Sequence, residues 1–166
     1  MARRIILQEG DETLTKVSRT VTVFDERLHT LLNDMRETME HAGGVGLAAP
    51  QVGVLRRVVL VLDTDELPED SETEGTLLEL INPEIIEVMG EQRDMEGCLS
   101  IPGVMGEVTR PQWVKIRAQD RHGAWFEVEG EGFTSRALCH EIDHLDGLLY
   151  TRLADELVSA ESGQGA

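Results

Sequence analysis

The stretch His140-Glu141-Ile142-Asp143-His144 says more about the fold than any other part of the sequence, because the spacing of its two histidines predicts a helix. Residues four apart lie on one face of a helix, so His140 and His144 can bind the same metal ion. Glu141 follows His140 directly, where its carboxylate can take a proton from a metal-bound water. The pattern therefore indicates metal-assisted hydrolysis. Its alternative is an ordinary helix that carries two surface histidines and binds no metal.

The motif predicts a helix over 133–148, with Thr134 or Ser135 as its N-cap. Another helix is predicted over 25–42, where apolar residues recur at helical spacing until two glycines end the pattern. Between these helices, continuous and alternating apolar runs predict strands over 58–63, 77–81, 84–88, 113–118 and 124–128.

Asn82-Pro83 predicts a turn between two of these strands, and residues 153–158 predict a short helix near the C-terminus. Together the elements predict an α+β fold, in which mainly antiparallel strands pack around a metal-bearing C-terminal helix. We expect a single catalytic domain at residues 1–150, followed by a short acidic tail at 151–166.

The formal net charge is −17 at pH 7. Nucleic-acid affinity comes largely from Lys and Arg that neutralise phosphates, so we expect neither direct nucleic-acid binding nor binding to a membrane. No apolar run approaches the roughly 20 residues that cross a bilayer, and residues 5–7 are too short for the core of a signal peptide. We therefore expect a cytoplasmic protein. The acidic run at 63–74 is interpreted as a solvated loop rather than a cation site.

A catalytic metal site needs a third protein ligand besides the two histidines. One common metalloprotease pattern would place a histidine at position 150, which is Tyr150, and the glutamates Glu156 and Glu161 lie in the tail outside any substantial helix. Cys98, in Glu96-Gly97-Cys98-Leu99-Ser100, is the better candidate, because a metal-bound thiolate is a strong ligand. Taken alone, a free cysteine is more often a small buried apolar residue.

The segment Gly44-Val45-Gly46-Leu47-Ala48-Ala49-Pro50-Gln51 combines small residues with one amide side chain. Small residues let a backbone approach a ligand closely, and Gln51 can donate a hydrogen bond. The segment lacks the Lys-Ser/Thr of a phosphate-binding loop. Its alternative is a turn that ends the first helix and enters a strand.

Segments 44–51, 96–100 and 140–144 resemble, in order and spacing, the three signature motifs of bacterial peptide deformylases. The resemblance extends along nearly the whole chain, from Ile6-Leu7-Gln8-Glu9-Gly10-Asp11 to Leu145-Asp146-Gly147. It implies a metal-dependent amidohydrolase that removes the N-formyl group from N-formylmethionyl nascent peptides and releases formate.

The resemblance implies a metal site formed by Cys98, His140 and His144. Metal-bound water would attack the formyl carbon, with Glu141 as general base and then as general acid toward the departing amine. The oxyanion would be stabilised by the metal, the Leu99 backbone N–H and the Gln51 side chain.

The peptide is expected to bind as an added strand along the backbone of Val45 and Gly46, as the resemblance implies. Phe133 and Ala137 would contribute to an apolar pocket for the methionine side chain, with ordinary core packing as their alternative role. Many relatives have an arginine that contacts the peptide where this chain has Met105, which puts that one contact in doubt.

One divalent metal ion is expected per chain. The resemblance points to Fe(II) in the cell, while a thiolate with two imidazoles also suits Zn(II), Ni(II) or Co(II) in preparations. Proximity to the ribosome follows from action on nascent chains. Some family members dock on the ribosome through a basic C-terminal helix, but residues 153–166 are acidic, so that interface is not transferred. Cys139 is interpreted as a packing residue, because it lies about 100° around the helix from His140.

Two other functions stay open from the sequence. A metallopeptidase that cleaves internal peptide bonds would need a further ligand and a larger cleft. A non-catalytic protein with a structural metal would usually supply four protein ligands and would leave Glu141 without a task.

Overall fold

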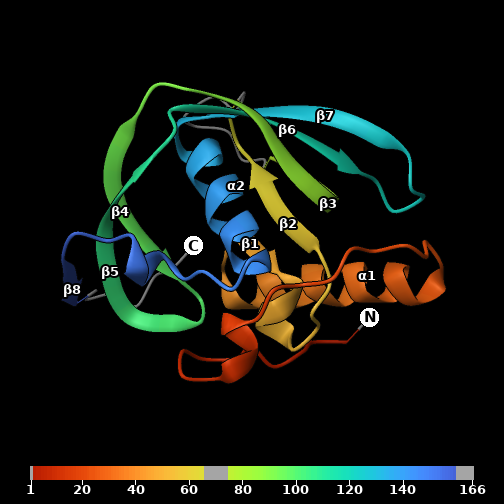
Figure 1. Cartoon of the computed structure of the whole chain (residues 1–166). Helices are drawn as coiled ribbons and strands as arrows, with labels where there is room; N and C mark the ends of the chain where they lie inside the picture. Colours follow the sequence, from red (N-terminus) through yellow and green to blue (C-terminus); the bar gives the residue numbers. More distant parts are fainter. Residues whose placement is uncertain (1, 66–74, 160–166) are drawn as a thin grey trace.

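The computed structural model describes residues 2–65 and 75–159, and the features below are those of this part of the chain (Figure 1). Helix α1 spans Glu26–Ala42, which confirms the predicted helix at 25–42. The Asp25 side chain caps its N-terminus by accepting a hydrogen bond from the Leu28 N–H. Gly43 ends it in the left-handed conformation at φ 71°, which glycine adopts without steric cost.

The larger sheet has five antiparallel strands in the order β1-β2-β3-β6-β7. Its strands are β1 (Gly46–Ala48), β2 (Val58–Asp63), β3 (Thr76–Met89), β6 (Trp113–Gln119) and β7 (Trp125–Glu131). The predicted hairpin of β6 and β7 is confirmed, with His122 in its turn.

The predicted turn at Asn82-Pro83 is wrong, because β3 runs through it as one strand. The first half of β3 pairs with β2 and the second half with β6, and the register shifts between Ile81 and Glu84. Asn82 adopts φ 52° at this irregularity, and its side chain exchanges hydrogen bonds with the Val21 backbone at 2.8 and 2.9 Å. A β-bulge, supported by pairing on both sides, has replaced the turn that the local sequence favours.

The smaller sheet contains β4 (Gln92–Cys98), β5 (Ile101–Arg110) and β8 (Leu157–Ser159), in the order β4-β5-β8. Leu99 and Ser100 connect β4 to β5. The helix predicted at 153–158 is wrong: a short 3-10 helix, η3 (Tyr150–Arg152), precedes β8, which pairs with β5. Backbone groups on the edge of β5 offer this segment partners that a local pattern cannot reveal. The domain boundary at residue 150 stays a prediction.

Helix α2 spans Gly132–Leu145 and carries the His-Glu-x-x-His motif, as predicted. The predicted caps Thr134 and Ser135 are wrong, because the helix begins earlier and both residues are buried in its first turn. Gly132 at φ 56° leads directly from β7 into the helix, and its N–H bonds to the Gln112 carbonyl at 2.8 Å. The Ser135 hydroxyl donates instead to the Pro111 carbonyl at 2.8 Å.

Strand β2 separates two apolar clusters, which explains its continuous apolar sequence. Val59 and Val61 pack toward α2, whereas Val58 and Leu60 pack toward α1. Figure 1 shows α2 lying across the larger sheet, with the smaller sheet beside it. The helix is therefore held between two sheets, and its side chains are almost all buried.

Among the described residues, no helix is both long enough and apolar enough to cross a bilayer. Residues 66–74 of the predicted acidic loop, and the end of the predicted tail at 160–166, lie outside the described residues. Cys98 and Cys139 are both free thiols, and Cys139, on α2, packs in the core as predicted.

Candidate metal centre

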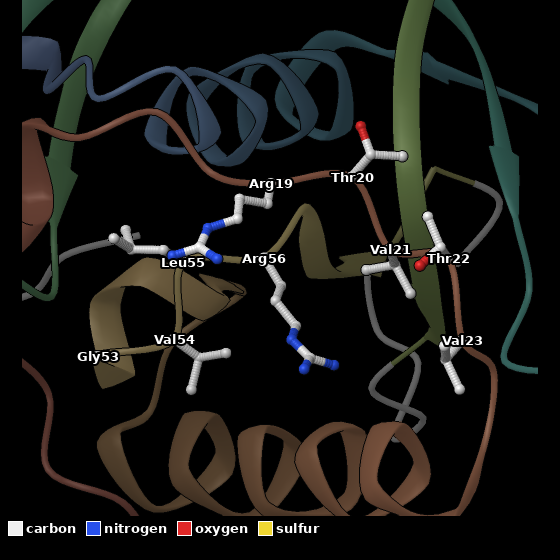
Figure 2. Close-up of a pocket in the computed structure, with 9 residues that line it drawn as sticks. All are labelled: Arg19, Thr20, Val21, Thr22, Val23, Gly53, Val54, Leu55 and Arg56. Atoms are coloured by element: carbon white, nitrogen blue, oxygen red, sulfur yellow. The ribbon is translucent and has the colours of Figure 1, made fainter.

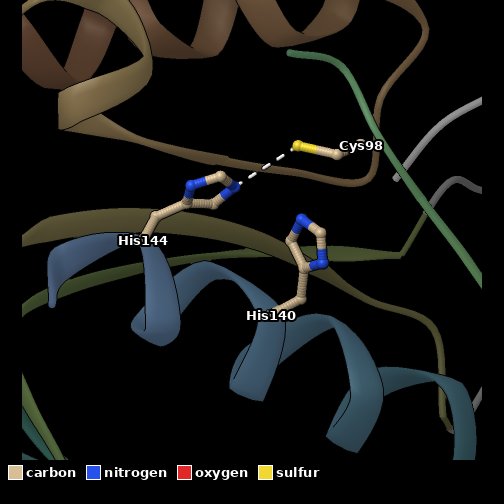
Figure 3. A group of neighbouring side chains, drawn as sticks. All are labelled: Cys98, His140 and His144. Carbon is tan, nitrogen blue, oxygen red and sulfur yellow. Dashed lines mark hydrogen bonds between the residues drawn. The ribbon is translucent and has the colours of Figure 1, made fainter. Parts of the chain in front are cut away.

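Cys98, His140 and His144 come together between β4 and α2 (Figure 3). Cys98 is the last residue of β4, and the two histidines follow one another by one turn of α2. The three ligand atoms lie within 4.8 Å of one another, and the Cys98 Sγ is 3.4 Å from the His144 Nε2. All three side chains are buried. The structure thus places the three predicted ligands around one point.

Several buried polar atoms at this point have no hydrogen-bond partner among the described residues. They include the His140 Nε2 and both carboxylate oxygens of Glu141. Leaving such atoms unpaired in a protein interior costs about 1–3 kcal/mol each, so a missing partner is expected here. One sulfur and two imidazole nitrogens suit a divalent transition metal, and three protein ligands leave a coordination position open. The residues therefore fit a catalytic metal ion.

Glu96 fixes the orientation of His140 from the side opposite the cluster. Its Oε1 lies 2.5 Å from the His140 Nδ1. Since a carboxylate accepts hydrogen bonds, this nitrogen must carry the hydrogen, which leaves the Nε2 lone pair for a metal. Burial alone would raise the pKa of Glu96, but hydrogen bonds from His140 and Arg110 outweigh it and hold the pKa at about 2.

Two buried arginines complete the surroundings of Glu96, and the sequence reasoning missed both. Arg110 donates to both carboxylate oxygens, at 2.5 and 3.0 Å, and also to Asp143 at 2.6 Å. Arg136 donates to the Glu96 Oε2 at 2.8 Å. A signal was available for Arg136, which lies four residues before His140 and hence on the same helix face. No sequence signal joins Arg110 to this motif.

Glu141 is fully buried on α2, with its carboxylate against the backbone of β1. A Cβ atom placed on Gly46 would come within 2.5 Å of the Glu141 Oε2, so only glycine fits beside this side chain. The Glu141 Oε1 is 4.0 Å from the His144 Nε2. Burial raises the pKa of Glu141 to about 7. The carboxylate can therefore both take up and release a proton near neutral pH.

Gln51 and Leu99, the predicted oxyanion donors, both lie next to Cys98. Gln51 belongs to the 3-10 helix η2 (Ala49–Val52), and its Oε1 accepts from the Ala48 N–H at 2.9 Å. Its Nε2 donates to the Ser100 Oγ at 3.1 Å and lies 3.6 Å from the Cys98 Sγ. These contacts aim the Gln51 amide at the thiol, and Leu99 follows the thiol directly in the chain.

The four predicted substrate residues lie in different surroundings. Gly46 begins β1, which forms one edge of the larger sheet, and Val45 precedes it. The Val45 carbonyl is already used by the Leu62 N–H at 2.8 Å. Phe133 is 52% exposed at the start of α2, whereas Ala137 is buried in the core cluster. Phe133 is thus free to contact a ligand, while Ala137 is engaged in packing.

A separate groove of about 430 Å³ lies between the segment 19–23 and the turn at 53–56. Figure 2 shows the Arg56 side chain extending into this space. No acid, cysteine or histidine is among the residues that line it. This groove therefore offers none of the acid, thiol or imidazole groups that form the cluster of Cys98 and the two histidines.

Comparison with known proteins identifies close relatives of the whole chain. The family model described as polypeptide deformylase matches residues 3–159. A peptide deformylase of Acetivibrio thermocellus is 59% identical over 151 residues, which cover 91% of this chain and 83% of the relative. A peptide deformylase of Caldanaerobacter subterraneus is 50% identical over 165 residues, covering 99% of this chain and 98% of the relative.

Solved structures give the same result for the fold. A peptide deformylase from Legionella pneumophila superposes with a TM-score of 0.83 at 44% identity, over 93% of this chain and 87% of that chain. The peptide deformylase from Ehrlichia chaffeensis in complex with actinonin superposes with a TM-score of 0.86 at 34% identity, over 94% and 91% of the two chains. The predicted fold class, with antiparallel strands around a C-terminal helix, is confirmed.

Proposed function

The chain belongs to the polypeptide deformylase family, and we propose that it hydrolyses the N-formyl group of N-formylmethionyl nascent peptides, releasing formate. The observation that carries this proposal is the convergence of Cys98, His140 and His144 beside a buried Glu141. The three ligands would hold one divalent metal, which supplies a Lewis acid that lowers the pKa of water.

Glu141 is proposed as the general base and then the general acid. Its pKa of about 7 matches this task, because a proton shuttle works best when its pKa lies near the working pH. The carboxylate would take a proton from the attacking water and return it to the departing amine. The Glu141 carboxylate packs directly against Gly46 of β1, where a side chain would not fit. This contact, together with the helix, fixes the position of the carboxylate.

Gln51 and the Leu99 N–H are proposed to stabilise the oxyanion that develops on the formyl group. The contacts of Gln51 with Ala48 and Ser100 support this role, since they hold its amide in one orientation beside Cys98. A donor fixed before the reaction needs no reorganisation when charge develops.

The peptide is proposed to add as a strand to the free edge of β1, along Val45 and Gly46. Phe133 is proposed as one wall of the methionine pocket because it is exposed at the start of α2. Ala137, one turn of α2 after Phe133 and buried in the core cluster, is proposed as a second wall of this pocket.

Fe(II) is proposed as the ion in the cell, and Zn(II), Ni(II) and Co(II) fit the same sulfur and nitrogen donors. We also propose a cytoplasmic location and transient proximity to the ribosome, because nascent peptides are the proposed substrate. The net charge of −17 argues against direct binding of nucleic acid.

The test is formate release from formyl-Met-Ala-Ser by protein purified without oxygen, with metal content measured on the same sample. Release should fall on chelation and return with Fe(II) or Ni(II). Glu141→Ala should keep the metal and lose nearly all turnover. Hydrolysis of unformylated peptides, with no release of formate, would instead favour a metallopeptidase.

A further inference from the structure

Arg136 is a buried cation that has no role in the proposed metal binding, proton transfer or oxyanion stabilisation. Its side chain, on α2, is 4% exposed. One nitrogen, Nη1, donates to the Glu96 Oε2 at 2.8 Å, and the other, Nη2, donates to the Val108 carbonyl of β5 at 2.9 Å. The guanidinium therefore joins α2 to both strands of the β4–β5 hairpin.

Glu96 uses its two oxygens for different partners. The Oε1 accepts from the His140 Nδ1 and from the Arg110 Nη2, each at 2.5 Å. The Oε2 accepts from the Arg110 Nε at 3.0 Å and from Arg136. Arg136 thus shares with Arg110 the oxygen that does not touch the histidine, and its shorter hydrogen bond opposes rotation of the carboxylate away from His140.

The carboxylates and guanidiniums of this network are equal in number only when Arg136 is included. Glu96 and Asp143 supply two carboxylates, and Arg110, which bonds to both, supplies one guanidinium. Arg136 supplies the second. Without it, the buried Glu96 and the partly exposed Asp143 would share the single guanidinium of Arg110, and a buried charge that is incompletely compensated is unfavourable.

We infer that Arg136 is a positioning residue for the metal ligand His140, acting through Glu96. The inference rests on the proposed metal site. Partners beyond the ligands themselves fix ligand orientation, and their loss typically costs 10- to 100-fold in metal affinity or activity. Arg136 is one contact further from the metal than Glu96, so its loss is expected to weaken Co(II) binding by about tenfold, at the lower end of that range.

A purely structural link between α2 and the hairpin is the competing explanation, and Arg136→Met and Arg136→Lys separate the two. Methionine fills similar space but removes both donors. Lysine restores the charge beside Glu96, but its single ammonium cannot reproduce the planar fork that also reaches Val108. Positioning through Glu96 predicts partial rescue of Co(II) binding by lysine. The visible spectrum of the Co(II)-substituted protein should change in Arg136→Met and recover partly in Arg136→Lys, because the spectrum reports ligand geometry.

The matched control is Arg121→Met. Arg121 forms a similar pair with Glu79, at 2.6 and 2.9 Å, but it lies on the β6–β7 turn outside this network. This variant should lower the melting temperature without changing Co(II) affinity or spectrum. A double variant tests the route of action: with Glu96→Gln already present, Arg136→Met should change Co(II) affinity by less than about twofold, since coupled residues are non-additive.

The inference is overturned if Arg136→Met lowers only the melting temperature and leaves Co(II) affinity and spectrum as in the wild type. It is equally overturned if the tenfold loss persists in the Glu96→Gln background, because Arg136 would then act by another route. If Arg136→Met does not fold, the Arg136→Lys spectrum decides, and an unchanged spectrum with unchanged affinity refutes positioning. Failure of the wild-type protein to bind Co(II) would refute the metal site itself, which is a separate result.

Discussion

Replacing Gly46 with alanine is expected to displace the Glu141 carboxylate while leaving every proposed metal ligand in place. The new Cβ would lie 2.5 Å from the Glu141 Oε2 and 2.9 Å from both its Cδ and its Cγ. Ordinary contact begins at 3.4 Å, so the carboxylate oxygen has to retreat by about 0.9 Å. Three atoms are too close, and Glu141 is fully buried, so a small rotation of the carboxylate does not relieve the contact.

A misplacement of about 1 Å in a catalytic group can cost on the order of 100-fold in rate. Gly46→Ala should therefore lower kcat for formyl-Met-Ala-Ser by about that factor. The added methyl group points at α2 and not along the free edge of β1, so KM should change much less. Co(II) affinity should be that of the wild type, because the three atoms nearest to the new methyl group all belong to Glu141 and not to a proposed ligand.

The control for crowding is Gly106→Ala on β5. Its Cβ would lie 2.6 Å from the Ala154 Cβ and 2.9 Å from the Leu157 Cδ2, in the β5–β8 contact. This variant should lose stability with little change in kcat. Wild-type kcat in Gly46→Ala would refute the role of Glu141 at its present position. Loss of Co(II) binding in Gly46→Ala would show that the site collapses as a unit, which contradicts the separation argued above.

Four further outcomes are expected. Cys98→Ala should abolish tight metal binding, and full metal occupancy in that variant would refute the ligand assignment. Cys139→Ser should keep the metal and lose roughly 1–3 kcal/mol in urea unfolding, because it buries a hydroxyl in the core. Gln51→Ala should lower kcat by roughly 100- to 1000-fold with metal retained, and an unchanged kcat would exclude it as an oxyanion donor. In metal-free protein, burial raises the pKa of Glu141 from 4.5 to about 7, so the stability that this group contributes is complete below pH 4.5 and is lost as the pH rises through 7. Relative to Glu141→Gln, the wild type should lose on the order of 3 kcal/mol across that window, and parallel pH profiles would contradict the raised pKa.

The parts of the site that could be predicted from sequence are those with local spacing. Two histidines one helical turn apart share a face whatever surrounds them. Cys98 required more, because its distance from His144 depends on how the β4–β5 hairpin packs against α2. The family resemblance supplied that pairing, and residue chemistry alone left it open. The pairing of Glu96 with Arg110 and Arg136 joins three separate segments, and the only sequence signal for it was the four-residue spacing of Arg136 and His140, which does not reveal Glu96 as the partner.

Two errors in the predicted fold have the same origin. Asn82-Pro83 is a strong local turn signal, but the hydrogen bonds of Asn82 with Val21 join residues 61 positions apart and hold the strand in register. The segment at 157–159 forms a strand because the edge of β5 is available to it. In both cases long-range pairing outweighs a local preference, which is the expected outcome where propensities amount to only tenths of a kcal/mol per residue.

Helix α2 has one face toward β4, one toward the core and one toward β1, and this arrangement explains why the site is buried. Each step of four residues turns the helix by about 40°, so Arg136, His140 and His144 form one stripe, which faces β4. Leu138 and Ile142 lie on the opposite side, in the core with the larger sheet. Glu141 falls between the two faces and meets β1 at Gly46. The core therefore sets the rotation of the helix, and that rotation sets the positions of the proposed ligands and of the proposed base together. An enlarged side chain at Leu138 would consequently move His140 and Glu141 as a pair, whereas a change at Gly46 moves Glu141 alone.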